Sequence, residues 1–267
     1  MLSVRKRWGA SLANALAFVK GRMWTELYIL LRIQVAIVRE QWIWIFIMAT
    51  IFPLTTLLFM KFMYGISSGE IMVNVIVGNI VFAIIMMGFN ALGQEISWQK
   101  HAGYFTFYSS LPISKAVFVV TQLVRGLMTA MPSVIIMAFI GQFAYGIRLH
   151  YEWGLIPIFL LAVLSMVGVG AGIGFWSPDH QMTNMLVQGL MMFVGFLSPV
   201  MMEASQLPPV LRYIGVIFPT TYSASALREM LTKGWTHEVT VDMFILIGFI
   251  VVSFAFISRM INWRAAD

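Results

Sequence analysis

The sequence contains no cysteine. Disulfide bonds, thiolate metal sites and thiol nucleophiles are therefore excluded. Charged residues are also scarce, since Asp, Glu, Lys and Arg make up 10% of the 267 residues, against roughly 25% in a soluble domain. Together with 60% apolar residues and a mean hydropathy of +0.86, this deficit predicts a chain whose surroundings are mostly lipid.

Two further absences concern nucleotides and metals. No Gly-Lys pair occurs anywhere in the chain, so the chain has no P-loop with which to hold a nucleotide. No H-E-x-x-H or other paired-histidine spacing occurs, and the histidines are isolated from one another: His101, His150, His180 and His237. We therefore expect no catalytic residue, no bound cofactor and no metal site in this chain.

Acidic residues are almost missing from the long apolar stretches. The exceptions stand near the ends of these stretches: Glu95, Glu152, Glu203 and Asp242. Ion-coupled transporters need carboxylates or histidines inside the bilayer, and a membrane-embedded enzyme needs such groups to converge. Both classes are therefore disfavoured, and a membrane-embedded enzyme or assembly factor is kept as the alternative from another class.

The apolar stretches predict an all-α membrane protein with six transmembrane helices. Each is long enough to cross a hydrocarbon core about 30 Å thick. Residues 1–41 mix apolar and charged positions at helical spacing, which is typical of an amphipathic helix at a membrane surface. We expect 1–41 to form an N-terminal cytoplasmic region and 42–267 a single transmembrane domain. The expected spans are 42–64, 71–93, 122–145, 155–176, 182–202 and 241–261.

Lysine and arginine are unevenly distributed around the expected spans. Eleven lie on the side of the termini and four on the other side. Because cytoplasmic loops carry the excess of basic residues, we expect both termini in the cytoplasm of a plasma or inner membrane. Arg5, Lys6 and Arg7 are not followed by a signal-peptide cleavage pattern, so we also expect the N-terminus to be retained.

Residues 94–115, which we call the polar segment, are not explained by membrane anchoring alone. They read QEISWQKHAGYFTFYSSLPISK and lie on the expected cytoplasmic side. Pro112 disfavours a helical Leu111, and Ser110 or Ser114 is suited to cap a helix, so we expect a helix–turn–helix. Lipid headgroups or a partner protein are both possible contacts for its aromatic side chains: Trp98, Phe105, Phe107 and Tyr108.

The other features concern helix packing and the outer side. Residues 203–240 contain three prolines and two apolar pieces shorter than the ~17 residues of a span, so we expect short helices on or in the outer leaflet.

The glycines of the fourth span predict close helix packing, within the chain or across a dimer: Gly168, Gly170, Gly172 and Gly174. The 21 methionines fit either ordinary packing or a pliable surface for apolar substrates.

The order of these features resembles the ABC-2 type family of ABC transporter permeases. In that family a carboxylate after the second span precedes a basic residue, a glycine and a Pro-aliphatic-Ser run. Further motifs begin within the expected fifth span and continue after it, and Phe218 stands where the family usually has Asn. The first set here is Glu95, Lys100, Gly103, Leu111, Pro112, Ile113 and Ser114; the second is Leu197-Ser198-Pro199, Leu207-Pro208-Pro209, Phe218-Pro219-Thr220-Thr221-Tyr222 and Ala226-Leu227-Arg228.

This resemblance, which covers the whole chain, implies one membrane half of an ATP-driven exporter. It implies a homodimer or heterodimer of such chains, two separate ATPase subunits that bind ATP and Mg²⁺, membrane lipid as surroundings and no nucleic acid. The polar segment would contain the coupling helix that docks on the ATPase. The residues implied in coupling are Glu95, Trp98, Lys100, His101, Gly103, Phe105, Phe107, Tyr108, Leu111, Pro112 and Ser114.

The resemblance further implies re-entrant helices in 203–240 that help to close the outer exit. The few charges in the spans favour a lipid-like or drug-like substrate, and an exporter of a polysaccharide or lipid-linked glycan is the alternative. The residues implied at the outer gate are Pro199, Pro208, Pro209, Phe218, Pro219, Tyr222 and Arg228.

Overall fold

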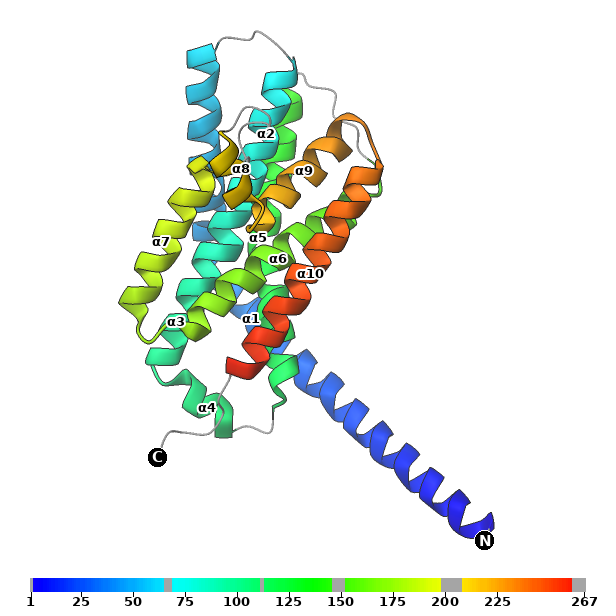
Figure 1. Cartoon of the computed structure of the whole chain (residues 1–267). Helices are drawn as coiled ribbons and strands as arrows, with labels where there is room; N and C mark the ends of the chain where they lie inside the picture. The colour runs from blue at the N-terminus through cyan, green and yellow to red at the C-terminus, as the bar shows by residue number, and fades with distance from the viewer. Residues whose placement is uncertain (1, 65–68, 111–112, 146–151, 198–207, 261–267) are drawn as a thin grey trace.

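The computed structural model describes residues 2–64, 69–110, 113–145, 152–197 and 208–260. Its regular elements within these ranges are all helices, which confirms the predicted all-α class, and they form one elongated bundle (Figure 1). The elements are α1 (Leu2–Tyr64), α2 (Gly69–Ile84), η1 (Ile85–Ala91), α3 (Leu92–His101), α4 (Tyr104–Ser110), α5 (Lys115–Tyr145), α6 (Leu155–Trp176), α7 (His180–Leu197), α8 (Pro209–Gly215), α9 (Pro219–Thr232) and α10 (His237–Met260).

Helix α1 joins the expected amphipathic region and the expected first span into one helix of 63 residues. No glycine or proline interrupts residues 23–52, and these two residue types are the ones that most strongly break a helix. The N-terminal part of α1 projects away from the bundle (Figure 1). Farther along, α1 packs against α5 and α2, while Trp42 and Trp44 are exposed.

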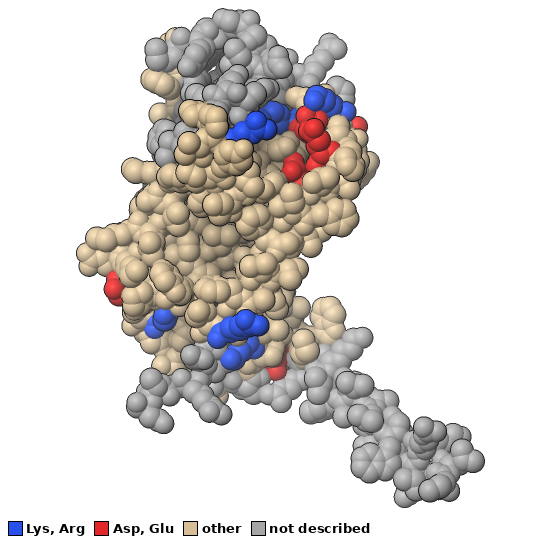
Figure 2. Space-filling view, viewed as in Figure 1, with Lys and Arg blue, Asp and Glu red and all other residues tan. Residues whose placement is uncertain are grey.

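Four stretches of the described residues are long and apolar enough to cross a membrane: 76–101, 115–136, 155–176 and 237–260. They lie where four of the six spans are expected, and α6 has the expected bounds. The spans expected at 42–64 and 182–202 stay predictions, and residues 198–202 of the latter lie outside the described residues. Figure 2 shows charged side chains mostly near the two ends of the bundle, with a broad uncharged band between them, as a membrane protein requires.

The second span differs from the expected one at its C-terminal end. It was expected to end at Gly93, but helix continues through the π-helical η1 and α3 to His101. Polarity did not end the helix because polar side chains of α3 find partners inside the protein. Gln99, for example, donates to the Glu95 carboxylate at 2.8 Å. The first eight residues of the polar segment are therefore part of a helix and not of a loop.

Helix α6 lies at the centre of the bundle, with α3, η1, α5, α9 and α10 packed around it (Figure 1). Two of its glycines face η1 and α3. A Cβ on Gly170 would collide with the carbonyl oxygen of Phe89, and one on Gly174 would lie 2.5 Å from that of Gly93. Only glycine permits such backbone-to-backbone approach.

The other two glycines of α6 face α10. A Cβ on Gly168 would lie 2.8 Å from the Cβ of Ser253. By contrast, a Cβ on Gly172 would meet Phe256 at 3.5 Å, an ordinary van der Waals distance. The four glycines thus serve two different faces, and all of these contacts lie within the chain.

Between α7 and α10, the described residues 208–236 contain two short helices. Two apolar pieces shorter than a span were expected here, and the structure has α8 over seven residues and α9 over fourteen. Pro209 and Pro219 begin these helices, where proline is favoured because its missing N–H has no helical partner. Helix α9 packs against α10, α6 and α2, with Ala224, Ala226 and Met230 fully buried.

Two substitutions in α6 test the backbone contact with η1. Gly170→Ala is expected to lower the free energy of unfolding by about 1–3 kcal/mol, because the added methyl overlaps a backbone carbonyl that has no room to move. Gly172→Ala, two residues away in the same helix, is the matched control and is expected to be neutral or stabilising, since alanine favours helix. Thermal unfolding in detergent, followed by tryptophan fluorescence, measures both, and equal effects would contradict the packing described above.

Candidate functional site

The polar segment forms the end of α3, the short helix α4 and the start of α5, at the end of the bundle opposite α8 (Figure 1). Gly103 separates α3 from α4 with a φ of +81°. This left-handed conformation costs glycine little and costs residues with a Cβ more. Gly103 therefore fixes the direction in which α4 leaves α3. Leu111 and Pro112 lie outside the described residues.

Ser114 caps the N-terminus of α5. Its hydroxyl oxygen accepts a hydrogen bond from the N–H of Val117 at 3.3 Å, which is the N-cap arrangement that serine favours. Its own N–H donates to the Glu26 carboxylate of α1 at 3.2 Å. A carboxylate near a helix N-terminus is electrostatically favourable. Sequence reasoning considered Ser114 as a cap but missed Glu26, because the two residues are far apart along the chain.

The aromatic residues of the polar segment fall into two groups, of which the first faces inward. The ring of Phe105 lies 5.6 Å from that of Phe118 in α5 and 5.5 Å from that of Phe175 in α6, and Tyr108 lies 5.3 Å from Phe118. Such edge and tilted contacts stabilise beyond their buried area. Burial also raises the pKa of the Tyr108 phenol. This group fixes α4 against α5 and α6.

The second group faces outward. Phe107 is 61% exposed, Trp98 48% and Tyr104 44%, and the rings of Trp98 and Tyr104 are 5.4 Å apart. We call these three side chains the exposed aromatic face. Beside it lies a mostly apolar groove of about 620 Å³ between α1 and α4. The groove is lined by Ile29, Leu30, Ile33, Ile37, Ala102, Gly103, Tyr104, Phe107, Tyr108 and Ile113.

An ion pair joins α3 to α5. Nη1 of Arg125 lies 3.3 Å from Oε1 of Glu95, which also accepts the hydrogen bond from Gln99. The Arg125 side chain is only 7% exposed and that of Glu95 is 32% exposed. Sequence reasoning did not pair Glu95 with Arg125, because the two residues are far apart along the chain. In the structure, Glu95 points to this buried guanidinium.

Lys100 and His101 contact the turn between α6 and α7, residues 177–179. Nζ of Lys100 donates to the carbonyl oxygens of Phe175 at 3.0 Å and Ser177 at 2.8 Å. Nε2 of His101 lies 2.6 Å from the carbonyl oxygen of Pro178. Next to them, the buried hydroxyl of Thr183 in α7 donates to that of Ser97 in α3 at 2.7 Å. Sequence reasoning found none of these contacts.

Phe218, one of the residues implied at the outer gate, packs near Phe193 of α7 with ring centroids 5.9 Å apart. Tyr222 of α9 donates its hydroxyl to the carbonyl oxygen of Val216 at 3.0 Å. These contacts hold the turn between α8 and α9. Pro208 is exposed, Arg228 is half-buried in α9, and Pro199 lies outside the described residues.

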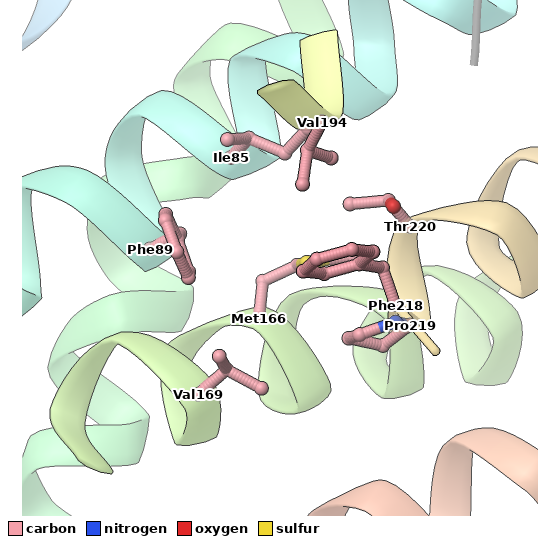
Figure 3. Close-up of a pocket in the computed structure, with 8 residues that line it drawn as sticks. All are labelled: Ile85, Phe89, Met166, Val169, Val194, Phe218, Pro219 and Thr220. Atoms are coloured by element: carbon pink, nitrogen blue, oxygen red, sulfur yellow. The ribbon is translucent and has the colours of Figure 1, made fainter. Parts of the chain in front are cut away.

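Figure 3 shows a small apolar space where η1, α6, α7 and α9 meet. Its volume is about 10 Å³, which leaves room for one water molecule at most. A substrate therefore does not fit at this point within one chain. The lining residues are Ile85, Phe89, Met166, Val169, Val194, Phe218, Pro219 and Thr220.

Titratable groups are sparse inside the bundle. No cluster of three His, Asp or Glu side chains suited to a metal occurs among the described residues. Among these residues Asp242 of α10 is the only buried acidic side chain, and Ser225 of α9 hydrogen-bonds it. The expectation that Asp242 stands near the end of a span agrees with its place in the second turn of α10.

Removing Glu95 tests the importance of its pair with Arg125. Glu95→Ala is expected to lower the free energy of unfolding by about 1–3 kcal/mol, because it leaves a buried guanidinium without its carboxylate. Glu229→Ala is the control, since its partner Lys233 is 67% exposed and stays solvated. Unfolding in detergent measures both variants, and a loss for Glu95→Ala no larger than that for Glu229→Ala would contradict a structural role for the pair.

Comparison with known proteins addresses the whole arrangement. No curated protein and no solved structure gives a significant match. The family model of the ABC-2 type transporter matches residues 25–232, which is more than half of the chain. The match extends from α1 to the end of α9 and includes the polar segment and both short helices. The chain therefore belongs to the ABC-2 type transporter family, whose members are membrane-spanning transport subunits.

Proposed function

We propose that this chain is the membrane-spanning subunit of an ATP-driven exporter that acts as a pair of such chains with two separate ATPase subunits. The observation that carries the proposal is the exposed aromatic face, Trp98, Tyr104 and Phe107. Exposed aromatic side chains at the polar end of a membrane protein fit contact with a partner protein, because aromatic residues dominate the binding energy of interfaces.

The way in which the exposed aromatic face is held in place supports docking of a partner protein over simple contact with lipid headgroups. Helix α4 is held from behind by Phe105 and Tyr108, and the adjoining start of α5 is capped by Ser114. A partner therefore meets a preorganised surface and loses little conformational entropy on binding. The groove of about 620 Å³ beside α4 offers room for side chains of the ATPase.

ATP and Mg²⁺ belong on the partner in this proposal. The chain has no Gly-Lys pair and hence no P-loop, so the energy for transport has to come from another subunit. When the ATPase subunits close on ATP, α4 moves with them. The rigid packing behind α4 passes this movement to the spanning helices, which is a rigid-body form of conformational change.

The substrate would pass between two chains and leave on the side of α8 and α9. The tight packing in Figure 3 supports this arrangement, because no substrate-sized space is present there within one chain. In the proposal, α8 and α9 are re-entrant helices that close the exit. The shortage of charge in the spans favours a lipid-like or drug-like molecule over a strongly polar one.

Single cysteines test the proposed orientation, since the chain has none of its own. Tyr213→Cys in α8 is expected to react with a membrane-impermeant maleimide in intact cells. Phe107→Cys in α4 is expected to react only after permeabilisation, because the positive-inside rule puts α4 in the cytoplasm. Labelling of Phe107→Cys from outside would reverse the topology and remove the proposed ATPase site.

A matched pair of alanine variants tests docking. Phe107→Ala is expected to lower the amount of P-loop ATPase that co-purifies with the chain by about tenfold, as the loss of an aromatic anchor does. Tyr213→Ala is the control, because Tyr213 is also aromatic and exposed but belongs to α8, which lies at the opposite end of the bundle from α4 (Figure 1). Affinity purification from native membranes with mass spectrometry gives the measurement.

Two results of that experiment would contradict the proposal. One is that the purified wild-type chain recovers no P-loop protein. The other is that Phe107→Ala and Tyr213→Ala retain the ATPase equally well. The wild-type chain is also assayed alone, and it is expected to hydrolyse no ATP.

A further inference from the structure

Lys100 and His101 were expected to bind a partner protein, but both contact backbone carbonyl oxygens of this chain. Lys100 donates to two carbonyl oxygens at the C-terminal end of α6, and His101 reaches the next carbonyl, that of Pro178. The carbonyl end of a helix carries partial negative charge. A cation there is favourable, and the last carbonyls of a helix otherwise lack backbone partners.

His101 makes a second contact of the same kind. Its Nδ1 lies 2.7 Å from the carbonyl oxygen of Ser97, while Nε2 faces Pro178. Both ring nitrogens of His101 therefore lie within hydrogen-bond distance of a backbone carbonyl oxygen, one in α3 and one in the turn between α6 and α7.

The turn itself is held on its other side by α7. Asp179 accepts the N–H of Met182 at 2.6 Å through its side chain and the N–H of Thr183 at 3.1 Å through its backbone. Thr183 in turn donates to Ser97 of α3. The end of α3, the turn and the start of α7 are therefore linked by one continuous set of hydrogen bonds.

We propose that Lys100 and His101 are positioning residues that fasten the α6–α7 turn to α3, so that α6 and α7 move together with the polar segment. We call Lys100 and His101, together with the carbonyls of Phe175, Ser177 and Pro178, the polar clamp. The proposal rests on the exporter function proposed above, because it assigns a route by which movement at α4 reaches two further helices.

The polar clamp changes the role of two residues. Lys100 and His101 do not bind the ATPase in this assignment but act through the turn. Without the clamp, Thr183 would still tie α7 to α3 and the glycines of α6 would still pack against η1 and α3, but the turn itself would lose its hydrogen bonds to Lys100 and His101. With the clamp, the turn moves with α3 as well.

The first experiment uses the chain alone in lipid nanodiscs. Lys100→Met is expected to speed amide hydrogen exchange at Met182 and Thr183 by about tenfold, because opening of the turn no longer breaks charge-assisted hydrogen bonds. Lys100→Arg is expected to restore the wild-type rate, since a guanidinium also donates to two carbonyls. Lys115→Met, which removes the same charge from an exposed position at the start of α5, is expected to change nothing.

The second experiment adds the ATPase subunits and a non-hydrolysable ATP analogue. A fluorinated tag on Gln181→Cys, next to the turn, reports its environment without interference from native cysteines. The fluorine resonance is expected to shift on nucleotide binding in the wild type and in Lys100→Arg, and to stay in place in Lys100→Met, although all three bind the ATPase equally.

The outcomes separate this proposal from the exporter function. Unchanged exchange in Lys100→Met, or no rescue by Lys100→Arg, overturns the clamp whether or not an ATPase binds. A resonance shift in Lys100→Met as large as in the wild type overturns the transmission of movement. Failure of the wild-type chain to bind any ATPase overturns the exporter function, and the exchange rates of the chain alone then still decide whether the clamp exists.

Discussion

The backbone contact of α6 with η1 and α3 is the interaction on which the rest of the structure depends. Gly170 and Gly174 bring α6 against the carbonyl oxygens of Phe89 and Gly93. At this separation the end of α3 reaches the last carbonyls of α6, and Phe175 reaches the ring of Phe105. A larger residue at Gly170 would push the helices apart and weaken both sets of contacts.

Charged side chains at the end of the second span are paired within the protein, which explains why hydropathy located the spans but not all of their ends. The helix from η1 to His101 continues because Glu95 pairs with Arg125 and Lys100 donates hydrogen bonds to carbonyl oxygens. Hydropathy scores each residue as if it faced lipid or water, so it ends a span where charges begin. Such a score takes no account of pairing between residues that are far apart in the sequence.

Local signals were the most reliable parts of the sequence. The bounds of α6, the capping role of Ser114 and the two short helices that begin at prolines follow from local composition and stereochemistry. The division of the aromatic residues of the polar segment into an inward-facing group and the exposed aromatic face does not follow from local composition. It depends on how Phe105 and Phe107, two residues apart on a helix, face opposite surroundings.

The π-helical turn η1 determines the direction in which the residues after it in the second span face. A π-turn takes up one more residue than an α-turn, and one residue corresponds to a rotation of about 100° around a helix axis. If 85–91 wound as α-helix with all of its residues kept, Glu95, Lys100 and His101 would rotate by about 100° away from Arg125 and the α6 carbonyls. A change of winding here would thus act as a change of facing, while the motif residues themselves remain intact.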